Sequence, residues 1–206
     1  DHTAGYPDFI FTPAVLDRDG PLTVFGPSGI QAMTDHILKA YEQDMKIRID
    51  GLEHGHAEAY RVIVHEFQPG IIYKDSNITV RAFLVHHGSW EESYGFRFET
   101  PDRVIVVSGD CTFSESVIEN GRGCDILIHE VYSHDGFTRR PLAWQKYHAQ
   151  FHTSTAQLAS MAEQIKPKLL ILTHQLICDS TEEKLIEELQ SVYHGEIVSG
   201  HDLDIY

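Results

Sequence analysis

The spacing of hydrophobic and polar positions changes along the chain from a helical pattern to a strand pattern. After Ser28, apolar residues recur at helical spacing as far as Tyr41, which predicts one amphipathic helix over residues 27–45 with Ser28 as its N-cap. Short runs rich in β-branched and aromatic residues follow, separated by Gly, Pro, Asn or Asp, as is typical of strands and their ends. The predicted strands are RVIVHEF, IIYKD, ITVRAFLV, YGFRFET and RVIVVSG.

From residue 103 onward, predicted strands alternate with predicted helices. Helices are expected over SESVIENG, over TSTAQLASMAEQI with Thr153 or Ser154 as the N-cap, and over STEEKLIEELQSVY. The strands between and after them are DILIHE, KLLILTH and EIVSG. A strand-rich first part and an alternating second part indicate sheets covered by helices in one α/β domain that spans residues 1–206.

Composition narrows the function classes. The chain has 206 residues, 42% of them hydrophobic, which is enough for one substantial core. No apolar run approaches the roughly 20 residues that a membrane helix needs, so no membrane association is expected. The net charge of -15 disfavours nucleic acid as a partner. We expect a small-molecule substrate instead. Cys111, Cys124 and Cys178 lack CxxC spacing, so we expect free thiols and a cytoplasmic location.

Metal-ligating side chains stand at the ends of predicted strands. These residues are His87, Asp110, Glu130 and His174. In α/β architectures, the loops at the carboxyl ends of strands gather around the ligand site. Together with Asp1 and His2 at the start of the chain, they offer imidazole and carboxylate ligands for Zn, Mn or Fe. Two such ions generate hydroxide at neutral pH, which is hydrolytic chemistry.

Five motifs, in order, resemble the metallo-β-lactamase superfamily. Residues 1–7, DHTAGYP, resemble the second half of its HxHxDH signature, and VHHGSWEESYGFRFE resembles its strand-end His followed by an aromatic-Gly-aromatic-Arg strand. VIVVSGDCTFSES resembles the SGDT motif, with Cys111 where the family usually has Thr. CDILIHEVYS and FHTSTAQLASMA resemble the HEAT and HST motifs of the ribonuclease Z and arylsulfatase-like branch. PKLLILTH resembles the strand that carries the last metal His, and the likeness extends to about residue 177.

The resemblance implies an αββα sandwich with two divalent metal ions, Zn first and Mn or Fe as alternatives. It assigns Asp1, His2 and His174 to one ion, His87 to the other and Asp110 to both. The family's first two histidines would precede Asp1, so we expect the chain to lack the first strands of the fold. Asp1 and His2 are expected to lie beside His174 and Asp110.

The resemblance also assigns a catalytic pair. Besides Asp1, the catalytic residues would be Glu130 and His152, a carboxylate that orients an imidazole and an imidazolium that protonates the leaving oxygen. His86, next to His87, should face the opposite way and bind no metal. Trp144, Tyr147 and Arg140, in the segment TRRPLAWQKYH, are candidates for a lid with substrate contacts, with ordinary loop packing as the alternative.

Three functions compete. The favoured one is a dinuclear hydrolase in which a metal-bound hydroxide attacks a phosphodiester, sulfate ester or lactone. The alternative is a transfer-RNA 3′-end endonuclease, ribonuclease Z. It is disfavoured by the net charge and because only a few residues around TPDR join two strands where the shorter enzymes of that kind insert a long arm. The third is an inactive fragment that binds a partner and whose exposed sheet edge would allow a homodimer.

Overall fold

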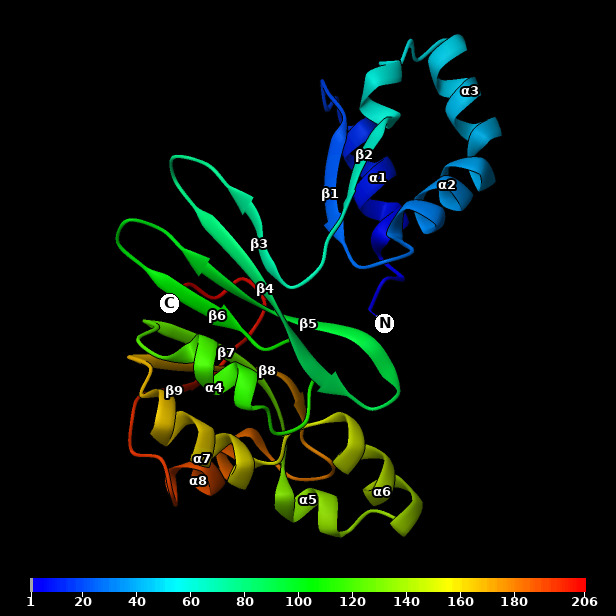
Figure 1. Cartoon of the computed structure of the whole chain (residues 1–206). Helices are drawn as coiled ribbons and strands as arrows, with labels where there is room; N and C mark the ends of the chain where they lie inside the picture. Colours follow the sequence, from blue (N-terminus) through cyan, green and yellow to red (C-terminus); the bar gives the residue numbers. More distant parts are fainter. Residues whose placement is uncertain (1) are drawn as a thin grey trace. The chain divides into compact units, whose positions relative to one another are not determined.

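A seven-stranded mixed sheet, in the order β3-β4-β5-β6-β7-β8-β9, organises the larger part of the chain in the computed structural model, which describes residues 2–206 (Figure 1). Neighbours from β3 to β6 are antiparallel, because short turns join them. Neighbours from β6 to β9 are parallel, because helices cross between them. The strands are β3 Gly70–Lys74, β4 Thr79–His87, β5 Trp90–Glu99, β6 Val104–Val107, β7 Ile126–Tyr132, β8 Leu169–Leu176 and β9 Ile197–Ser199.

Helices α4, α7 and α8 cover one face of this sheet (Figure 1). Leu158, Met161 and Leu170 are fully buried between the helices and the strands. Full burial of such a side chain contributes about 1.5–3 kcal/mol relative to exposure. Ser154 caps α7 in a reciprocal capping box with Gln157, which confirms one of the two predicted caps. The helices are α4 Glu115–Gly121, α5 His134–Thr138, α6 Leu142–Phe151, α7 Thr155–Ile165 and α8 Glu182–Gln190.

The residues up to Gln68 form a compact unit separate from Pro69–Tyr206. This first unit has a parallel two-stranded sheet and a small core that includes Ile10, Phe11 and Tyr60. A single domain over all 206 residues stays a prediction. Its elements are α1 Tyr6–Val15, β1 Leu22–Gly26, α2 Ile30–Ala40, α3 Glu42–Asp50, a 3-10 turn Ala57–Tyr60 and β2 Val62–Glu66.

The single helix predicted over residues 27–45 is wrong in two respects. It is divided at Tyr41 into α2 and α3, and its N-cap is Gly29 rather than Ser28. The φ of Gly29 is 92°, a left-handed conformation that favours glycine. The carboxylate of Glu66 accepts hydrogen bonds from the N–H groups of Gly29 and Gln31. A side chain far along the chain therefore satisfies N–H groups that an N-cap side chain normally satisfies.

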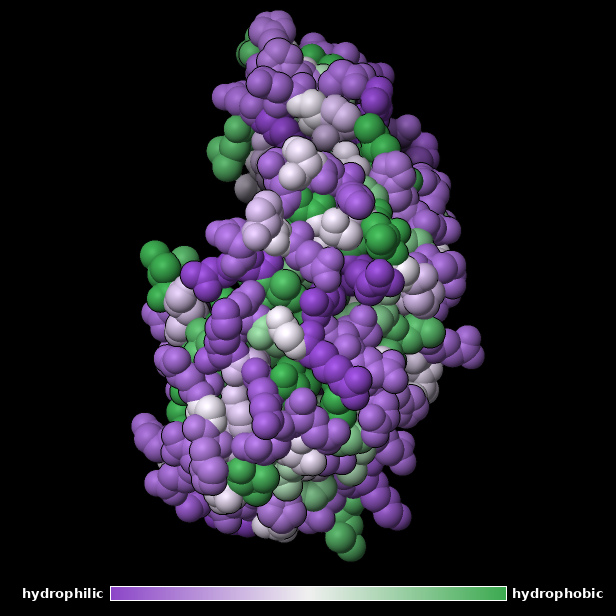
Figure 2. Space-filling model, turned by 60° about the vertical axis from the view of Figure 1, so that its left-hand side comes forward, coloured by the Kyte–Doolittle hydropathy of each residue, from purple (hydrophilic) through white to green (hydrophobic). Residues whose placement is uncertain are grey.

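The α/β fold with helices on a sheet is confirmed, and every strand predicted after residue 60 is present. The face shown in Figure 2 is mostly hydrophilic, with hydrophobic side chains in small groups. The three cysteines are buried free thiols, as predicted. Within residues 2–206, no helix has both the length and the apolar character that crossing a membrane requires.

Candidate metal and catalytic site

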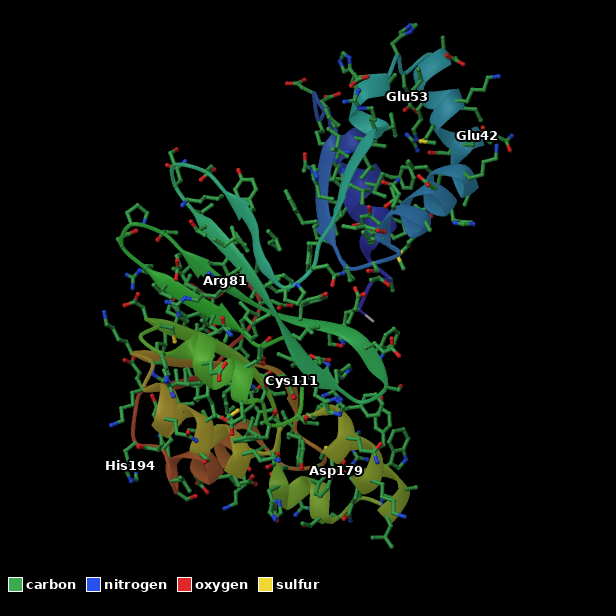
Figure 3. The ribbon with its side chains drawn as sticks, in the orientation of Figure 1. Glu42, Glu53, Arg81, Cys111, Asp179 and His194 are labelled. Carbon is green, nitrogen blue, oxygen red and sulfur yellow. The ribbon has the colours of Figure 1, made fainter. Side chains whose placement is uncertain are left out.

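The carboxyl ends of four strands meet at one edge of the seven-stranded sheet. Strands β6, β7 and β8 are parallel, and β4 runs the same way because β5 is antiparallel to both β4 and β6. Such an edge is where open α/β sheets bind ligands. Cys111, labelled in Figure 3, marks this edge in the picture. The predicted residues at this edge are His87, Asp110, Glu130 and His174.

Asp110 is positioned by the turn that follows β6. The preceding Gly109 has a φ of 64°, and a Cβ there would lie 2.6 Å from the carbonyl oxygen of Tyr94. Only glycine fits a left-handed conformation at this close approach to a neighbouring strand. The SGD sequence therefore has a local physical reason, which is to carry the backbone past β5 and present Asp110 at the edge.

A β-bulge in β8 positions His174. Thr173 pairs with Glu130 and Gln175 pairs with Val131, so His174 is the extra residue. Its φ is 43°, and a left-handed non-glycine residue costs about 1–3 kcal/mol and is often found at functional sites. His174 Nε2 lies 3.5 Å from Asp110 Oδ2. The structure therefore brings these two predicted ligands together.

His87 follows an irregularity in the pairing of β4 with β5 and is buried. Its Nδ1 lies 2.7 Å from the carbonyl oxygen of Phe151. Since that carbonyl can only accept, Nδ1 carries the proton, and Nε2 keeps the lone pair that a metal requires. Gly88, with a φ of 55°, lets the ring of Phe151 pack against the backbone, since a Cβ there would overlap that ring. His86 is exposed, as predicted for the neighbour that faces away.

Glu130 and His152 form the predicted carboxylate–imidazole pair. Glu130 Oε2 lies 3.5 Å from His152 Nδ1, and both side chains are buried. Glu130 Oε1 accepts the N–H groups of Thr153 at 2.7 Å and Cys111 at 3.4 Å. Burial raises the pKa of Glu130 to about 8, although these two N–H groups act to lower it. The pair can therefore retain a proton near neutral pH.

His129, which precedes Glu130, is a core residue. It is fully buried, its Nδ1 lies 2.6 Å from the carbonyl oxygen of Glu130, and burial lowers its pKa to about 4. A neutral, buried imidazole held by the backbone is a structural residue. The prediction that only Glu130 of this dipeptide serves the site fits this geometry.

The donor set fits a divalent metal ion. Asp110 and His174, two of the predicted ligands, present an oxygen and a nitrogen 3.5 Å apart, and ligand atoms of His174, Glu130 and His152 all lie within 4.8 Å of one another. Glu130 Oε2 is buried and has no hydrogen-bond partner within residues 2–206. The rings of His152 and His174 stack with centroids 5.4 Å apart. Imidazole nitrogens and carboxylate oxygens at such short range are the ligands that Zn and similar ions prefer.

Two predicted ligands precede the unit Pro69–Tyr206 that carries this edge. Asp1 lies outside the described residues. His2 belongs to the unit that ends at Gln68. The assignment of both residues to the ion of His174 stays a prediction.

Sequence reasoning missed His148, which lies on α6 with its ring centroid 5.8 Å from that of His152. Burial, followed by the charges of His152 and Arg140, lowers the pKa of His148. No helix was predicted for the segment around it, which forms a helix from Leu142 to Phe151. The signal was present, because residues 144, 148 and 152 follow one another at a spacing of four, which places side chains on one side of a helix.

The family follows from a comparison with known proteins. Residues 1–175 match the family model described as the beta-lactamase superfamily domain. The chain belongs to this superfamily. Ribonuclease Z of Mycobacterium bovis (strain BCG / Pasteur 1173P2) is 28% identical, over 98% of this chain and 74% of its own length. Ribonuclease Z of Anoxybacillus flavithermus is 24% identical, over 94% of this chain and 72% of its own length.

Solved structures share the fold. A metallo-beta-lactamase fold protein of Bacillus subtilis has a TM-score of 0.68 at 18% identity, over 97% of this chain and 70% of that chain. The short form of human tRNase Z has a TM-score of 0.64 at 21% identity, over 97% of this chain and 72% of that chain. Zn-bound PqqB of Methylobacterium extorquens has a TM-score of 0.53 at 16% identity, over 94% of this chain and 69% of that chain.

The family membership settles the class of enzyme. The protein is a metal-dependent hydrolase that acts on ester bonds, and its fold implies divalent metal ions. The site at the carboxyl edge of the sheet has the residue types that this chemistry requires.

Proposed function

We propose that the chain is a ribonuclease Z-like phosphodiesterase that cleaves RNA, with transfer-RNA precursors as the first substrates to test. Relatives named ribonuclease Z align with nearly the whole chain, so they favour this function over the small ester, sulfate ester or lactone that the sequence favoured. The observation that carries the proposal is the buried Glu130–His152 pair beside Asp110 and His174.

The net charge of -15 was a poor guide to the surface near this site. Residues 136–162 contain no Asp or Glu, although they contain Arg139, Arg140 and Lys146. This segment leads directly into His152 and the start of α7. Arg139 pairs with Asp135 and Arg140 lies 3.6 Å from Asp179, so Lys146 is the cation of this segment that an approaching polyanion would meet. The net charge of the whole chain therefore does not exclude nucleic acid as a partner.

His87, Asp110 and His174 would hold the metal ions, with Asp1 and His2 as further predicted ligands. We expect two Zn ions, with Mn or Fe as alternatives. When bound, divalent ions activate water and stabilise the developing charge on the phosphoryl oxygens. The hydrogen bond from His87 Nδ1 to Phe151 and the bulge at His174 fix the direction of two imidazoles before any ion binds.

The role of Glu130 and His152 is to hold and deliver a proton. The Glu130 carboxylate is fixed by two backbone N–H groups and faces His152 Nδ1, which sets the orientation of that ring. Because burial raises the pKa of Glu130, the pair does not lose its last proton below neutral pH. His152 can then donate a proton to the departing ribose oxygen, which is general acid catalysis.

The test uses a transfer-RNA precursor with a 3′ trailer and the small diester bis(p-nitrophenyl) phosphate, each with Zn or Mn. We expect a single 3′ cleavage that a chelator abolishes and that His87→Ala removes. His86→Ala is the matched control, because it removes the exposed neighbouring imidazole. Hydrolysis of the diester without any RNA product would contradict the proposal and support a hydrolase of small esters.

A further inference from the structure

Helix α6 exposes large side chains next to the catalytic pair. None of its ten residues is buried. Leu142, Trp144 and Tyr147 are 75%, 55% and 45% exposed. Aromatic side chains of this size are normally highly buried on average, and exposed groups of them mark interaction sites.

Two rows of rings connect this exposed face to the site. In one row, the ring centroids of Trp144 and His148 are 5.7 Å apart, and those of His148 and His152 are 5.8 Å apart. In the other, Tyr147 stacks on Phe151 at 4.5 Å, and Phe151 lies edge-on to His87 at 5.1 Å. A flat ligand stacked on Trp144 or Tyr147 would thus continue a series of rings that ends at a predicted metal ligand and at the proton donor.

The C-terminal end of α6 is fixed to the sheet edge. The N–H of Gly88 donates to the carbonyl oxygen of Gln150 at 2.9 Å, and His87 bonds to that of Phe151. The exposed rings are therefore held at a defined place relative to His87, although no residue of the helix is buried.

The charged residues near Trp144 and Tyr147 indicate which kind of ligand would stack on these two rings. Arg139 pairs with Asp135, and Arg140 lies 3.6 Å from Asp179, which is labelled beside α5 and α6 in Figure 3. Lys146 is exposed and has no acidic partner within 4.0 Å among residues 2–206. The rings of Trp144 and Tyr147 meet edge to face with centroids 5.8 Å apart, and Lys146 is an exposed cation on the same helix. Exposed aromatic rings with a nearby cation are the combination that binds single-stranded nucleic acid.

Selection of a polynucleotide substrate requires a binding surface outside the catalytic pair. β5 ends at Glu99 and β6 begins at Val104, so no long arm is inserted between these strands. A substrate held only by the metal ions and the Glu130–His152 pair would lack contacts that select a polynucleotide over a small diester.

We propose that Trp144 and Tyr147 stack on unpaired bases of the RNA strand that enters the site, while Lys146 contacts its phosphates. This inference rests on the proposed function, since it deepens the definition of the substrate. Stacking of this kind tolerates any base, because every base has a flat aromatic face. The platform therefore selects an unpaired end rather than a sequence.

Fluorescence provides the first test. The chain has two tryptophans, Trp90 and Trp144, so Trp90→Phe leaves Trp144 as the only tryptophan. We expect short oligocytidylate to quench Trp144 emission with saturation. We further expect the double variant Lys146→Ala/Tyr147→Ala, built on Trp90→Phe, to raise the Kd roughly tenfold or more.

A matched control removes the same residue types elsewhere. Tyr73 and Lys74 are adjacent and exposed on β3, so Tyr73→Ala/Lys74→Ala should leave the Kd within about twofold. Equal losses of affinity in both double variants would overturn the inference, because they would indicate nonspecific attraction. An oligonucleotide that saturates without changing Trp144 emission would also overturn it.

Kinetics separate the two proposals. We expect Trp144→Ala to lower the ratio of kcat/KM for RNA to kcat/KM for bis(p-nitrophenyl) phosphate about tenfold. A wild type that cleaves RNA, with an unchanged ratio in Trp144→Ala, would overturn the platform and leave the proposed function intact. A wild type that binds oligocytidylate through Trp144 but cleaves no RNA would overturn the proposed function and leave the platform intact.

Discussion

The proposed catalytic pair and helix α6 lie next to each other and are built in opposite ways. Glu130 and His152 are buried and held by backbone hydrogen bonds, whereas Trp144, Lys146 and Tyr147 are exposed on a helix without buried residues. Burial fixes the geometry and shifts the pKa that proton transfer requires, and exposure leaves rings available to a substrate. Under the two proposals, the chemical step and the recognition of the substrate belong to separate groups of residues. Substitutions in the two regions should therefore change different kinetic constants.

The largest effect is expected in the buried region. Glu130→Gln keeps the size of the side chain but removes the carboxyl group that shares a proton with His152, so kcat for RNA should fall by about 10²–10⁴. KM should change little, because the substituted group does not touch the bases. Steady-state kinetics on a precursor RNA measures both constants. A rise in KM at constant kcat would show that Glu130 acts in substrate binding. Its role would then not differ from the role proposed for α6.

The next effect concerns stability and pH in the metal-free protein. The pKa of Glu130 is about 8 in the folded protein and 4.5 in the absence of burial, so the folded state binds the proton more tightly. Its stabilising contribution is complete below about pH 4.5 and is lost as pH rises through about 8. Within that window the free energy of unfolding should fall by about 1 kcal/mol per pH unit relative to Glu130→Gln. Urea unfolding between pH 5 and 8 tests this, and parallel curves for the two proteins would contradict it.

A smaller effect is expected at the turn that presents Asp110. Gly109→Ala adds a Cβ at a φ of 64° and 2.6 Å from the carbonyl oxygen of Tyr94. The strain should cost about 1–3 kcal/mol in the free energy of unfolding. Gly123→Ala is the matched control, because its φ is 71° but a Cβ there meets no atom within 4 Å. Equal losses in the two variants, measured by thermal unfolding, would show that the close approach to β5 adds nothing.

The smallest effect is expected on α6. Lys146→Ala/Tyr147→Ala should raise KM for precursor RNA about tenfold with kcat nearly unchanged, because these residues contact the strand and not the reacting atoms. The thermal midpoint should stay that of the wild type, since neither side chain is buried. A lower kcat at constant KM would show that α6 takes part in the chemical step.

The same contrast explains which parts of the molecule could be predicted. His87, Asp110, Glu130 and His152 follow local patterns and the motifs that surround them, so the sequence alone named them as candidates. The bulge at His174 and the approach of Tyr94 to Gly109 depend on neighbouring strands, which a single sequence does not display. The predicted N-cap of α2 was wrong for the same reason, because the Glu66 side chain on a neighbouring strand accepts the N–H group of Gly29.

Helix α6 was missed for a different physical reason. Its aromatic residues do not face a core, so they leave no hydrophobic face of the usual kind, and the Pro141 before it is typical of a loop as well as of a helix start. The net charge of the whole chain is an average, so it did not show that residues 136–162 contain no Asp or Glu.

The central claim is that the Glu130–His152 pair delivers a proton to the leaving oxygen of a phosphodiester. The direct measurement compares kcat of the wild type and His152→Ala on precursor RNA and on bis(p-nitrophenyl) phosphate. A ribose oxygen needs a proton to depart and nitrophenolate does not, so we predict a loss of about 10²–10⁴ on RNA and a far smaller loss on the diester. Equal losses on both substrates would contradict the account.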